Sequence, residues 1–336
     1  MLTPRQTEQF GSSCQYRYDD SNLVGSGSFG EVYTARITER GDYVGEDVVA
    51  VRRVSIMHKS LVEDPENYGK LRERFQLLLN LQHIHLVQYH QISIIPTRMA
   101  AAVKLMMDYY PNGNLQTKLQ RMKDSGIHLH CREAVGHALD LADGLAFLHQ
   151  NNIVHGDLKP ENVLIDRSSA HGQLQQENLR ISDLDHLVTL QRSTVSALGG
   201  EHFRGSERYM SPEMLRAIGP PVSRHTWPVL PGCATDMWSV GCILLQLVRC
   251  MTGDYREILH HPVSGQVRGA GATETLKDLA FSTAVMSGYI PVVLVSDAAC
   301  TAVPPELAAC IGDCLRTAGD QRITAQQLCD RLSHIN

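Results

Sequence analysis

The sequence contains no apolar run long enough to cross a membrane. Its longest apolar stretches, such as residues 240–248, fall well short of the roughly 18–20 residues that a membrane helix needs. Residues 1–14 show no apolar stretch typical of a secretory signal. The nine cysteines include no C-x-x-C pair, which indicates free thiols in a reducing compartment. We therefore expect a soluble intracellular protein of the cytoplasm, and the sequence leaves a nuclear location open.

An excess of positive charge is also missing. The net charge of -5 and the pI near 6.3 give no reason to expect a nucleic acid or an anionic membrane surface as a partner. The remaining composition, 43% hydrophobic and 20% charged residues, is that of an ordinary globular protein. A chain of 336 residues is long enough for one large or two medium domains.

The paired ligand spacing of structural zinc sites is absent as well. His128, His130 and Cys131 lie close together, and Cys310 and Cys314 lie one helical turn apart. Neither group has the spacing that a tetrahedral zinc site requires. We expect these side chains to be ordinary core or surface residues.

The pattern of apolar residues predicts an α+β protein with a β-rich first part and a helical second part. Alternating and β-branched segments predict strands in residues 14–25, 31–37, 47–56, 86–95 and 101–110. A helix is expected in 68–82, where Leu71, Phe75 and Leu78 have helical spacing. After residue 114, helices are expected in 131–150, with Leu139, Ala142, Ala146 and Leu148 among its buried residues, and in 235–250, 305–317 and 324–334. Long polar loops are expected at 168–178, 191–206, 217–232 and 260–273.

A glycine-rich run, G-S-G-S-F-G, contributes Gly25, Gly27 and Gly30. Glycines let the backbone turn sharply and bring N–H groups close to phosphates. The same string marks dinucleotide-binding folds, but there a helix follows it. Here the β-branched and aromatic segment at 31–37 follows. The run is therefore expected to join two strands and to approach the phosphates of a nucleotide.

A second and more specific cluster, H-G-D-L-K-P-E-N, supplies Asp157, Lys159 and Asn162, and Asp183 follows further along the chain. Phosphoryl transfer to a hydroxyl requires a carboxylate that orients the hydroxyl and receives its proton. It also requires metal ligands and a cation near the transferred group. Asp157 suits the first role and Asn162 and Asp183 suit the second, while Lys159 is placed to steady the transferred group.

Taken together and in this order, the motifs resemble those of a eukaryotic protein kinase domain over residues 18–334. The D-L-K-P-E-N form resembles the serine/threonine branch. The resemblance implies a bilobal fold that follows an N-terminal extension over residues 1–17. Its N-lobe covers about 18–107, its hinge 108–113 and its C-lobe 114–336.

The same resemblance implies ATP and Mg²⁺ as cofactors and assigns further residues. Met107 falls at the gatekeeper position, and Asp236 matches the acid that holds the catalytic loop. Glu213 and Arg322 match an ion pair that anchors the activation segment. The residues implied in nucleotide binding are Gly25, Gly27, Gly30, Val32, Ala50, Arg52, Asp108, Tyr110 and Leu164.

Arg52 departs from the family pattern. The segment V-A-V-R at 49–52 occupies the place of V-A-I-K, so an arginine replaces the lysine that grips the α- and β-phosphates. Arginine keeps the charge but is longer, planar and forked, so the exchange is not conservative. Since side chains alternate along a strand, Arg53 is expected to face solvent.

Arg74 occupies the position of the family's helix glutamate, so an arginine is expected to face Arg52. Two like charges in a partly dry site are costly unless an anion neutralises them. ATP is one such anion, and Asp183 or Asp185 is another. A shift in helix register that installs Glu73 is the alternative.

Two further departures concern the metal site and regulation. Asp185 stands where the family's magnesium-binding triplet ends in glycine, and it places another carboxylate near the metal. Gly156 stands where many kinases have an arginine that pairs with a phosphorylated activation loop.

Two interpretations of the function remain open at this stage. In the first, the chain is a serine/threonine kinase of weakened activity that acts on a protein substrate. In the second, it is a pseudokinase that regulates a partner protein, because Arg52 and Arg74 replace the lysine–glutamate pair.

Overall fold

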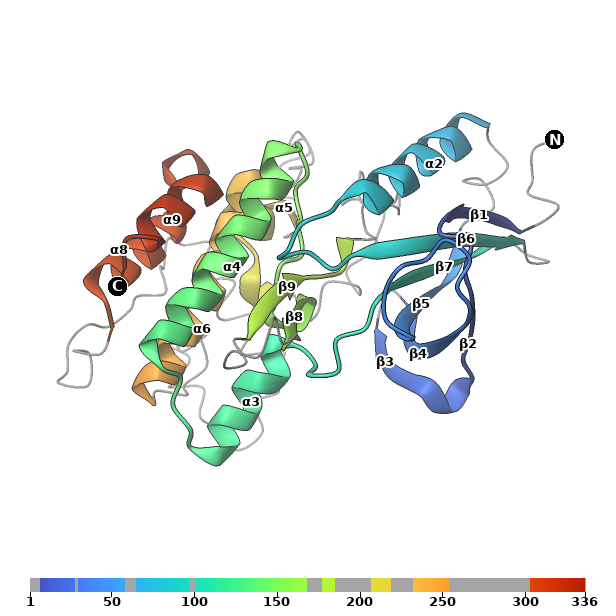
Figure 1. Cartoon of the computed structure of the whole chain (residues 1–336). Helices are drawn as coiled ribbons and strands as arrows, with labels where there is room; N and C mark the ends of the chain where they lie inside the picture. The colour runs from blue at the N-terminus through green and yellow to red at the C-terminus, as the bar shows by residue number, and fades with distance from the viewer. Residues whose placement is uncertain are drawn as a thin grey trace, which may run out of the picture. The chain divides into compact units, whose positions relative to one another are not determined.

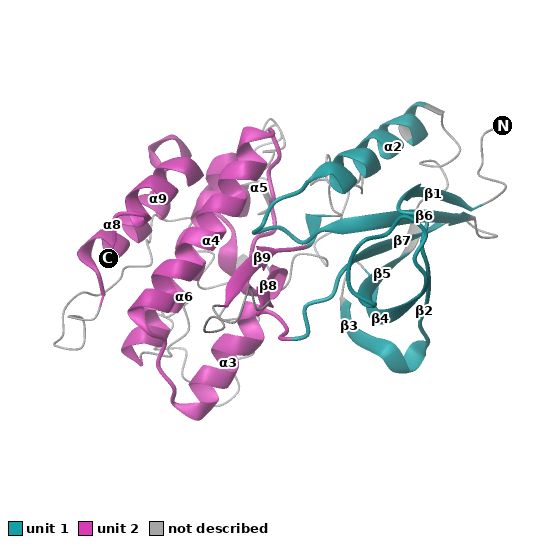
Figure 2. Cartoon of the chain, in the orientation of Figure 1, with its two compact units in different colours: residues 1–111, 183–192 teal, residues 112–182, 193–336 magenta. Residues whose placement is uncertain are grey.

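The computed structural model describes residues 7–27, 30–57, 65–96, 101–167, 177–184, 207–218, 232–253 and 303–335. The chain divides into two compact units (Figure 2). The first unit comprises residues 1–111 and 183–192, and the second comprises 112–182 and 193–336. The first is built on a sheet and the second is mainly helical, which confirms the predicted α+β class. Among the described residues, no helix combines the length and apolar character needed to span a membrane.

The first unit contains a seven-stranded antiparallel sheet (Figure 1). The order along the sheet is β1-β6-β7-β5-β4-β2, and β3 pairs with β4. The strands are β1 (Glu8–Gly11), β2 (Gln15–Arg17), β3 (Leu23–Gly27), β4 (Gly30–Glu39), β5 (Val48–Met57), β6 (Tyr89–Pro96) and β7 (Ala101–Asp108). The segment expected as one strand over 14–25 is interrupted by a short 3₁₀ turn, η1 (Asp20–Asn22).

Alternation along these strands builds the core of the sheet. Val49 and Val51 of β5 are completely buried and pack with Met106 of β7. Because a strand points successive side chains to opposite faces, Ala50 and Arg52, which alternate with these valines, point to the other face of the sheet. The remaining members of this cluster are Cys14, Ala35 and Tyr43, with Tyr16, Tyr18 and Ile37 packed against it.

Helix α2 (Pro65–Asn80) also belongs to the first unit and lies over β1 and β6 (Figure 1). Leu71, Phe75 and Leu78 are completely buried, as their spacing predicted. The helix is therefore held mainly by one apolar stripe, which is the usual source of helix stability in proteins.

The second unit is formed around two long helices, α4 (Cys131–Gln150) and α6 (Cys233–Thr252) (Figure 1). Nearly every residue of α6 between Thr235 and Met251 is buried, as its apolar composition predicted. The other elements are α3 (Leu115–Ser125), η2 (Pro160–Asn162), β8 (Val163–Asp166), β9 (Asn178–Ile181), η5 (Glu207–Tyr209), α5 (Pro212–Ile218), α8 (Pro305–Cys314), η8 (Gly319–Gln321) and α9 (Ala325–Leu332).

Three expectations for this unit differ from the structure or fall outside the described residues. Ala142, Ala146 and Leu148 are buried, but Leu139 is only half-buried because the buried face of α4 runs through Ala138 and Leu141. Helix α8 ends at Cys314, three residues before the expected end. The predicted polar loops at 168–178, 191–206, 217–232 and 260–273 lie almost entirely outside the described residues.

Candidate active site

The residues of the first unit that were expected to hold a nucleotide share one face of its sheet. In the β4–β5 pair, Val32 lies directly opposite Arg52, and Thr34 lies opposite Ala50. Directly opposed residues of antiparallel strands point to the same face. Val32, Ala50 and Arg52 therefore lie together on the face away from the buried valines of β5. Arg53 points to the opposite face from Arg52 and is exposed to solvent, as predicted.

Arg52 forms an ion pair with Asp183, the residue predicted to bind the metal ion. Arg52 Nη1 lies 2.6 Å from Asp183 Oδ1, and the two side chains are only 12% and 13% exposed. Solvent and salt screen such a pair much less than a pair on the surface. The sequence named Asp183 as one of the anions that can neutralise this arginine, and the ion pair confirms it.

Asp183 adopts a left-handed backbone conformation, with φ of 63°. This region costs a non-glycine residue about 1 kcal/mol, although aspartate tolerates it better than most residues. The preceding residue, Ser182, is fixed within the second unit, where its N–H and hydroxyl donate to the Asn162 carbonyl at 2.8 and 2.9 Å. Asp185, the predicted departure from glycine, lies outside the described residues.

On helix α2, Arg74 is half-buried and Glu73 is exposed. One residue rotates a side chain by about 100° around a helix, so only one of the two can belong to the buried side. In the structure, Arg74 lies closer to the buried side of α2 than Glu73 does. The exposed Glu73 does not take the inward position of the alternative register, and the approach of Arg74 to Arg52 stays a prediction.

The glycine run forms the hairpin between β3 and β4. Gly27 pairs with Gly30 across the turn, and Ser28 and Phe29 lie outside the described residues. Gly30 has φ of 127°, and a Cβ there would lie 2.2 Å from the Arg53 carbonyl oxygen, so only glycine fits. At Gly25 a Cβ would come within 4 Å of no atom in the described part of the chain, so packing there does not require glycine.

The end of β7 and the residues after it carry Asp108 and Tyr110, and both side chains are engaged within the first unit. The Asp108 N–H donates to the Gln88 carbonyl at 3.1 Å. His90 Nε2 lies 2.7 Å from Asp108 Oδ1, and the Tyr110 hydroxyl donates to Oδ2 at 3.4 Å. His90 was missed in the sequence, because its role depends on β6 lying beside β7.

Asp157, Lys159 and Asn162 come together on the turn between α4 and β8 of the second unit. Lys159 Nζ lies 3.1 Å from Asp157 Oδ2, and Asn162 Nδ2 donates to the Asp157 carbonyl oxygen at 2.8 Å. Asp157 and Asn162 are buried, and Leu164 is half-buried on β8. The turn therefore fixes a carboxylate, an ammonium group and an amide in one place.

Asp236 at the start of α6 holds this turn from inside the second unit. Its Oδ2 accepts the His155 N–H at 2.8 Å, and its Oδ1 accepts the Gly156 N–H at 2.7 Å. His149 Nε2 also lies 2.9 Å from Oδ2, and Asp236 is almost completely buried. This arrangement confirms the predicted role of Asp236 beneath the catalytic loop.

His155 is a further supporting residue that the sequence analysis quoted but did not assign. Its side chain is completely buried, Nδ1 accepts the Asp157 N–H at 3.2 Å, and Nε2 donates to the Ser182 carbonyl at 2.9 Å. These two bonds require the neutral imidazole with its proton on Nε2. His155 thus ties the Asp157 turn to the chain that leads to Asp183.

Glu213 and Arg322 form the predicted ion pair. Arg322 Nη1 and Nη2 donate to the two carboxylate oxygens of Glu213 at 2.6 and 2.8 Å, and the arginine side chain is completely buried. The guanidinium also donates to the Ala234 carbonyl at 2.7 Å and lies 5.2 Å from the Trp238 ring. Burial opposes ionisation of Glu213, yet the hydrogen bonds from Arg322 hold its pKa below the usual value.

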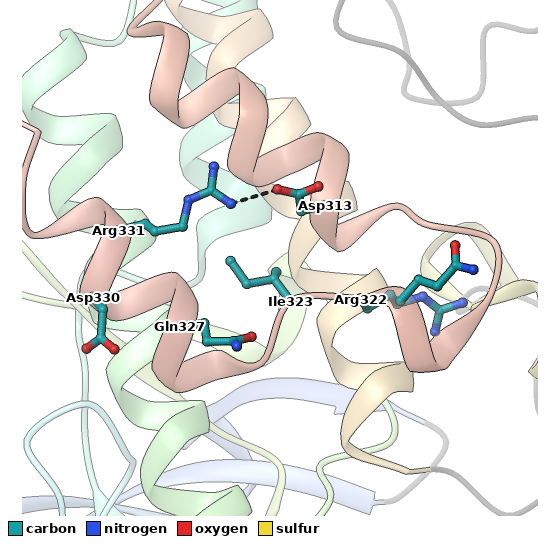
Figure 3. A pocket seen from close by; sticks show the side chains of 7 residues that line it. Asp313, Arg322, Ile323, Gln327, Asp330 and Arg331 are labelled. Carbon is teal, nitrogen blue, oxygen red and sulfur yellow. Dashed lines mark hydrogen bonds and ion pairs between the residues drawn. The ribbon is translucent and has the colours of Figure 1, made fainter.

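A pocket of about 410 Å³ lies elsewhere in the second unit, between α8 and α9 (Figure 3). Arg331 extends into it and pairs with Asp313 at 2.7 Å and with Glu306 at 2.5 Å. The residues that line this pocket include none of the predicted catalytic or nucleotide-binding residues. Because its arginine is already neutralised by carboxylates, we assign it no chemistry.

Comparisons with known proteins agree with these motifs. A family model described as "Protein kinase domain" matches residues 18–332. Serine/threonine-protein kinase SSK22 of Saccharomyces cerevisiae is 26% identical over 243 residues, which cover 70% of this chain and 16% of that protein. Mitogen-activated protein kinase kinase kinase 3 of Homo sapiens is 27% identical over 229 residues, which cover 67% and 31%. Serine/threonine-protein kinase VIK of Arabidopsis thaliana is 34% identical over 204 residues, which cover 59% and 41%. The chain thus spans less than half the length of each of these relatives.

Proposed function

The chain belongs to the protein kinase family, and from this premise we propose that it is a serine/threonine-kinase-like phosphotransferase. It binds ATP and magnesium and transfers the γ-phosphate to a serine or threonine hydroxyl of a protein. Arg52 and Arg74 weaken this activity. The observation that carries the proposal is the buried turn on which Asp157, Lys159 and Asn162 meet.

Each residue of this turn has a distinct part in phosphoryl transfer. Asp157 orients the attacking hydroxyl and receives its proton. Lys159, 3.1 Å from that carboxylate, steadies the transferred group. Asp236 binds the N–H groups of His155 and Gly156, so the Asp157 carboxylate has a fixed position before any substrate arrives.

The donor set of the candidate metal ligands fits magnesium, which prefers carboxylate and amide oxygens. Asn162 turns its amide nitrogen toward the Asp157 carbonyl, so its Oδ1 remains as the ligand atom. Asp183 supplies a carboxylate that binds Arg52 in this structure. Magnesium, when bound with ATP, neutralises the charge of the phosphate oxygens.

The nucleotide is held by main chain and apolar side chains. The glycines of the β3–β4 hairpin suit close approach of phosphates to main-chain N–H groups, while Arg52 supplies a positive charge to them. The Asp108 side chain is bound to His90, so we assign the adenine contacts of that segment to its main chain. The full set comprises Gly25, Gly27, Gly30, Val32, Ala50, Arg52, Asp108, Tyr110 and Leu164.

A second candidate function is supported by the ion pair between Arg52 and Asp183. A metal ligand whose carboxylate is bound to an arginine at 2.6 Å is less available to magnesium. In that case the chain is a pseudokinase, a scaffold or allosteric regulator of a partner protein.

Phosphate transfer from labelled ATP separates the two functions. We expect the purified chain with magnesium to phosphorylate a general serine/threonine substrate. Asp157→Asn should lower this activity at least about 100-fold, because it removes the group that receives the proton. The matched control is Asp124→Asn, which changes an exposed aspartate of α3 and should leave the rate unchanged.

Equal transfer by the native chain and by Asp157→Asn would identify the activity as a contaminant. That result would rule out the enzyme function and leave the scaffold function.

A further inference from the structure

Strand β1 lies before the region that the family model matches, yet it extends the sheet of the first unit (Figure 1). It pairs antiparallel with β6, with Phe10 opposite Ile92. The Ser12 N–H continues this ladder by donating to the His90 carbonyl at 2.8 Å. The buried Gln91 amide donates to the Ser12 carbonyl at 2.7 Å. The end of β1 is therefore fixed to the sheet by both main-chain and side-chain bonds.

One face of β1 points toward helix α2. Glu8 and Phe10 are half-buried, whereas the two residues that alternate with them are exposed. The Phe10 and Phe75 rings lie 5.5 Å apart, and the Arg72 guanidinium lies 5.5 Å from the Phe10 ring. Arg72 Nε also lies 3.2 Å from Glu8 Oε1, and the Tyr68 hydroxyl donates to Glu8 Oε2. Positions 68, 72 and 75 lie on one side of α2, so the strand contacts about two turns of the helix.

Gly11 permits this close approach. It has φ of 79°, and a Cβ there would lie 2.2 Å from the His90 carbonyl oxygen. A larger residue would therefore push β1 away from β6 or force the backbone into a strained conformation. A Cβ at Gly11 would also lie 3.0 Å from Leu79 Cδ2 of α2, so only glycine lets the strand pack against both β6 and the helix.

We propose that β1 is a latch that fixes α2 on the sheet, with Glu8 and Phe10 as positioning residues. The contacts at Tyr68, Arg72 and Phe75 hold the helix segment that also carries Arg74. Releasing the latch therefore frees α2 to open while the rest of the molecule stays folded. The consequence for nucleotide binding rests on the proposed function, but the latch itself does not.

Hydrogen exchange of the full chain, followed by mass spectrometry, tests the latch. In Phe10→Ala, we expect amides of residues 68–80 to exchange about tenfold faster, because an aromatic contact and its burial are lost. Amides of α4 and α6 should keep their native rates. Phe10→Leu keeps an apolar side chain and should restore most of the protection, and Gln9→Ala on the exposed face should change little.

Unchanged exchange in α2, or equal acceleration in α2, α4 and α6, would overturn the proposal. If Phe10→Ala does not fold, Glu8→Gln removes only the negative charge of the ion pair with Arg72 and should accelerate α2 alone to a smaller extent. Binding of a fluorescent ATP analogue then measures the effect on the nucleotide site, with a weaker affinity expected in Phe10→Ala and recovery in Phe10→Leu. A native chain that binds no nucleotide would refute the proposed function, while the exchange data would still decide the latch.

Discussion

Arg52 presents a planar, forked guanidinium where the family has a compact ammonium, and this difference in shape decides what the residue can hold. It binds Asp183 at 2.6 Å with both side chains largely out of solvent. Removing one partner of a buried pair is costly, because the other charge stays behind in a poorly solvated place. A metal ion at Asp183 must therefore compete with Arg52. Arg74, half-buried on α2, stands where the family has the acid that would draw the first charge away.

Restoring the family pair should relieve this competition. We expect Arg52→Lys combined with Arg74→Glu to raise the phosphotransfer rate about tenfold over the native chain, a change of roughly 1.4 kcal/mol in the barrier. The introduced acid would bind the introduced lysine and leave Asp183 to the metal. Each single change should give a smaller gain, so the test is a double-mutant cycle of initial rates.

The matched control for this cycle is Arg53→Lys combined with Arg121→Glu, which makes the same exchanges at two exposed positions, on β5 and α3. A double variant at 52 and 74 that is no faster than the native chain would show that another step limits catalysis.

At the scale of elements, Lys118 connects α3, α4 and the residue that leads into β9. Its ammonium donates to Glu133 and to Glu177 and lies 3.3 Å from His137 Nε2. The ligating atoms of Glu133, His137 and Glu177 all lie within 4.8 Å of one another, a distance suited to a metal ion. Lys118 binds both carboxylates and Arg167 pairs with Glu177 as well, so cations already occupy this group and we interpret it as a structural tie.

This tie predicts a specific dependence of stability on pH. A hydrogen bond from His137, together with Lys118, lowers the pKa of Glu133 from 4.5 to about 2. A carboxyl whose pKa is lower in the folded state stabilises the protein above its unfolded pKa, and this contribution is lost as the pH falls. We expect Glu133→Gln to reduce the free energy of unfolding by about 1 kcal/mol at pH 7, since the pair is partly exposed. The difference from the native chain should shrink as the pH falls from 4.5 toward 2.

Urea unfolding at several pH values measures this difference. Asp124→Asn, an exposed change on the same pair of helices, should show no such trend. A constant difference between Glu133→Gln and the native chain at all pH values would contradict the prediction.

Elements whose apolar residues recur at a regular helical spacing could be predicted from the sequence. Elements that are held in place by caps or by pairing with a distant strand could not. Leu71, Phe75 and Leu78 mark α2 because their spacing alone defines a buried stripe. Helix α3 has only three buried residues in a polar segment and begins at a side-chain cap, where Asn114 accepts the Thr117 N–H at 2.9 Å. Strand β1 is equally hard to predict, because its four residues are held by pairing with β6, eighty residues away in the sequence.

At the scale of the molecule, the site residues belong to two separate stretches of chain. Val32, Ala50 and Arg52 lie in the first unit, whereas Asp157 and Asn162 lie in the second. The roles of these residues follow from local motifs, so the sequence predicts them. The sequence does not predict the partner of Arg52, because the choice among ATP, Asp183 and Asp185 depends on how distant segments fold together.

Ligand binding should stabilise the whole chain against heat. A ligand that binds only the folded state at 100 times its dissociation constant adds about 2.7 kcal/mol to the free energy of unfolding. For a chain of this size we expect ATP with magnesium to raise Tm by several degrees, and ATP without magnesium to raise it less. Arg52→Ala should abolish most of the shift, because it removes the arginine that we propose binds the α- and β-phosphates. Arg53→Ala removes the same side chain at the neighbouring exposed position and should keep the full shift. Equal shifts in the two variants, measured by differential scanning fluorimetry at matched ATP concentrations, would show that Arg52 does not hold the nucleotide.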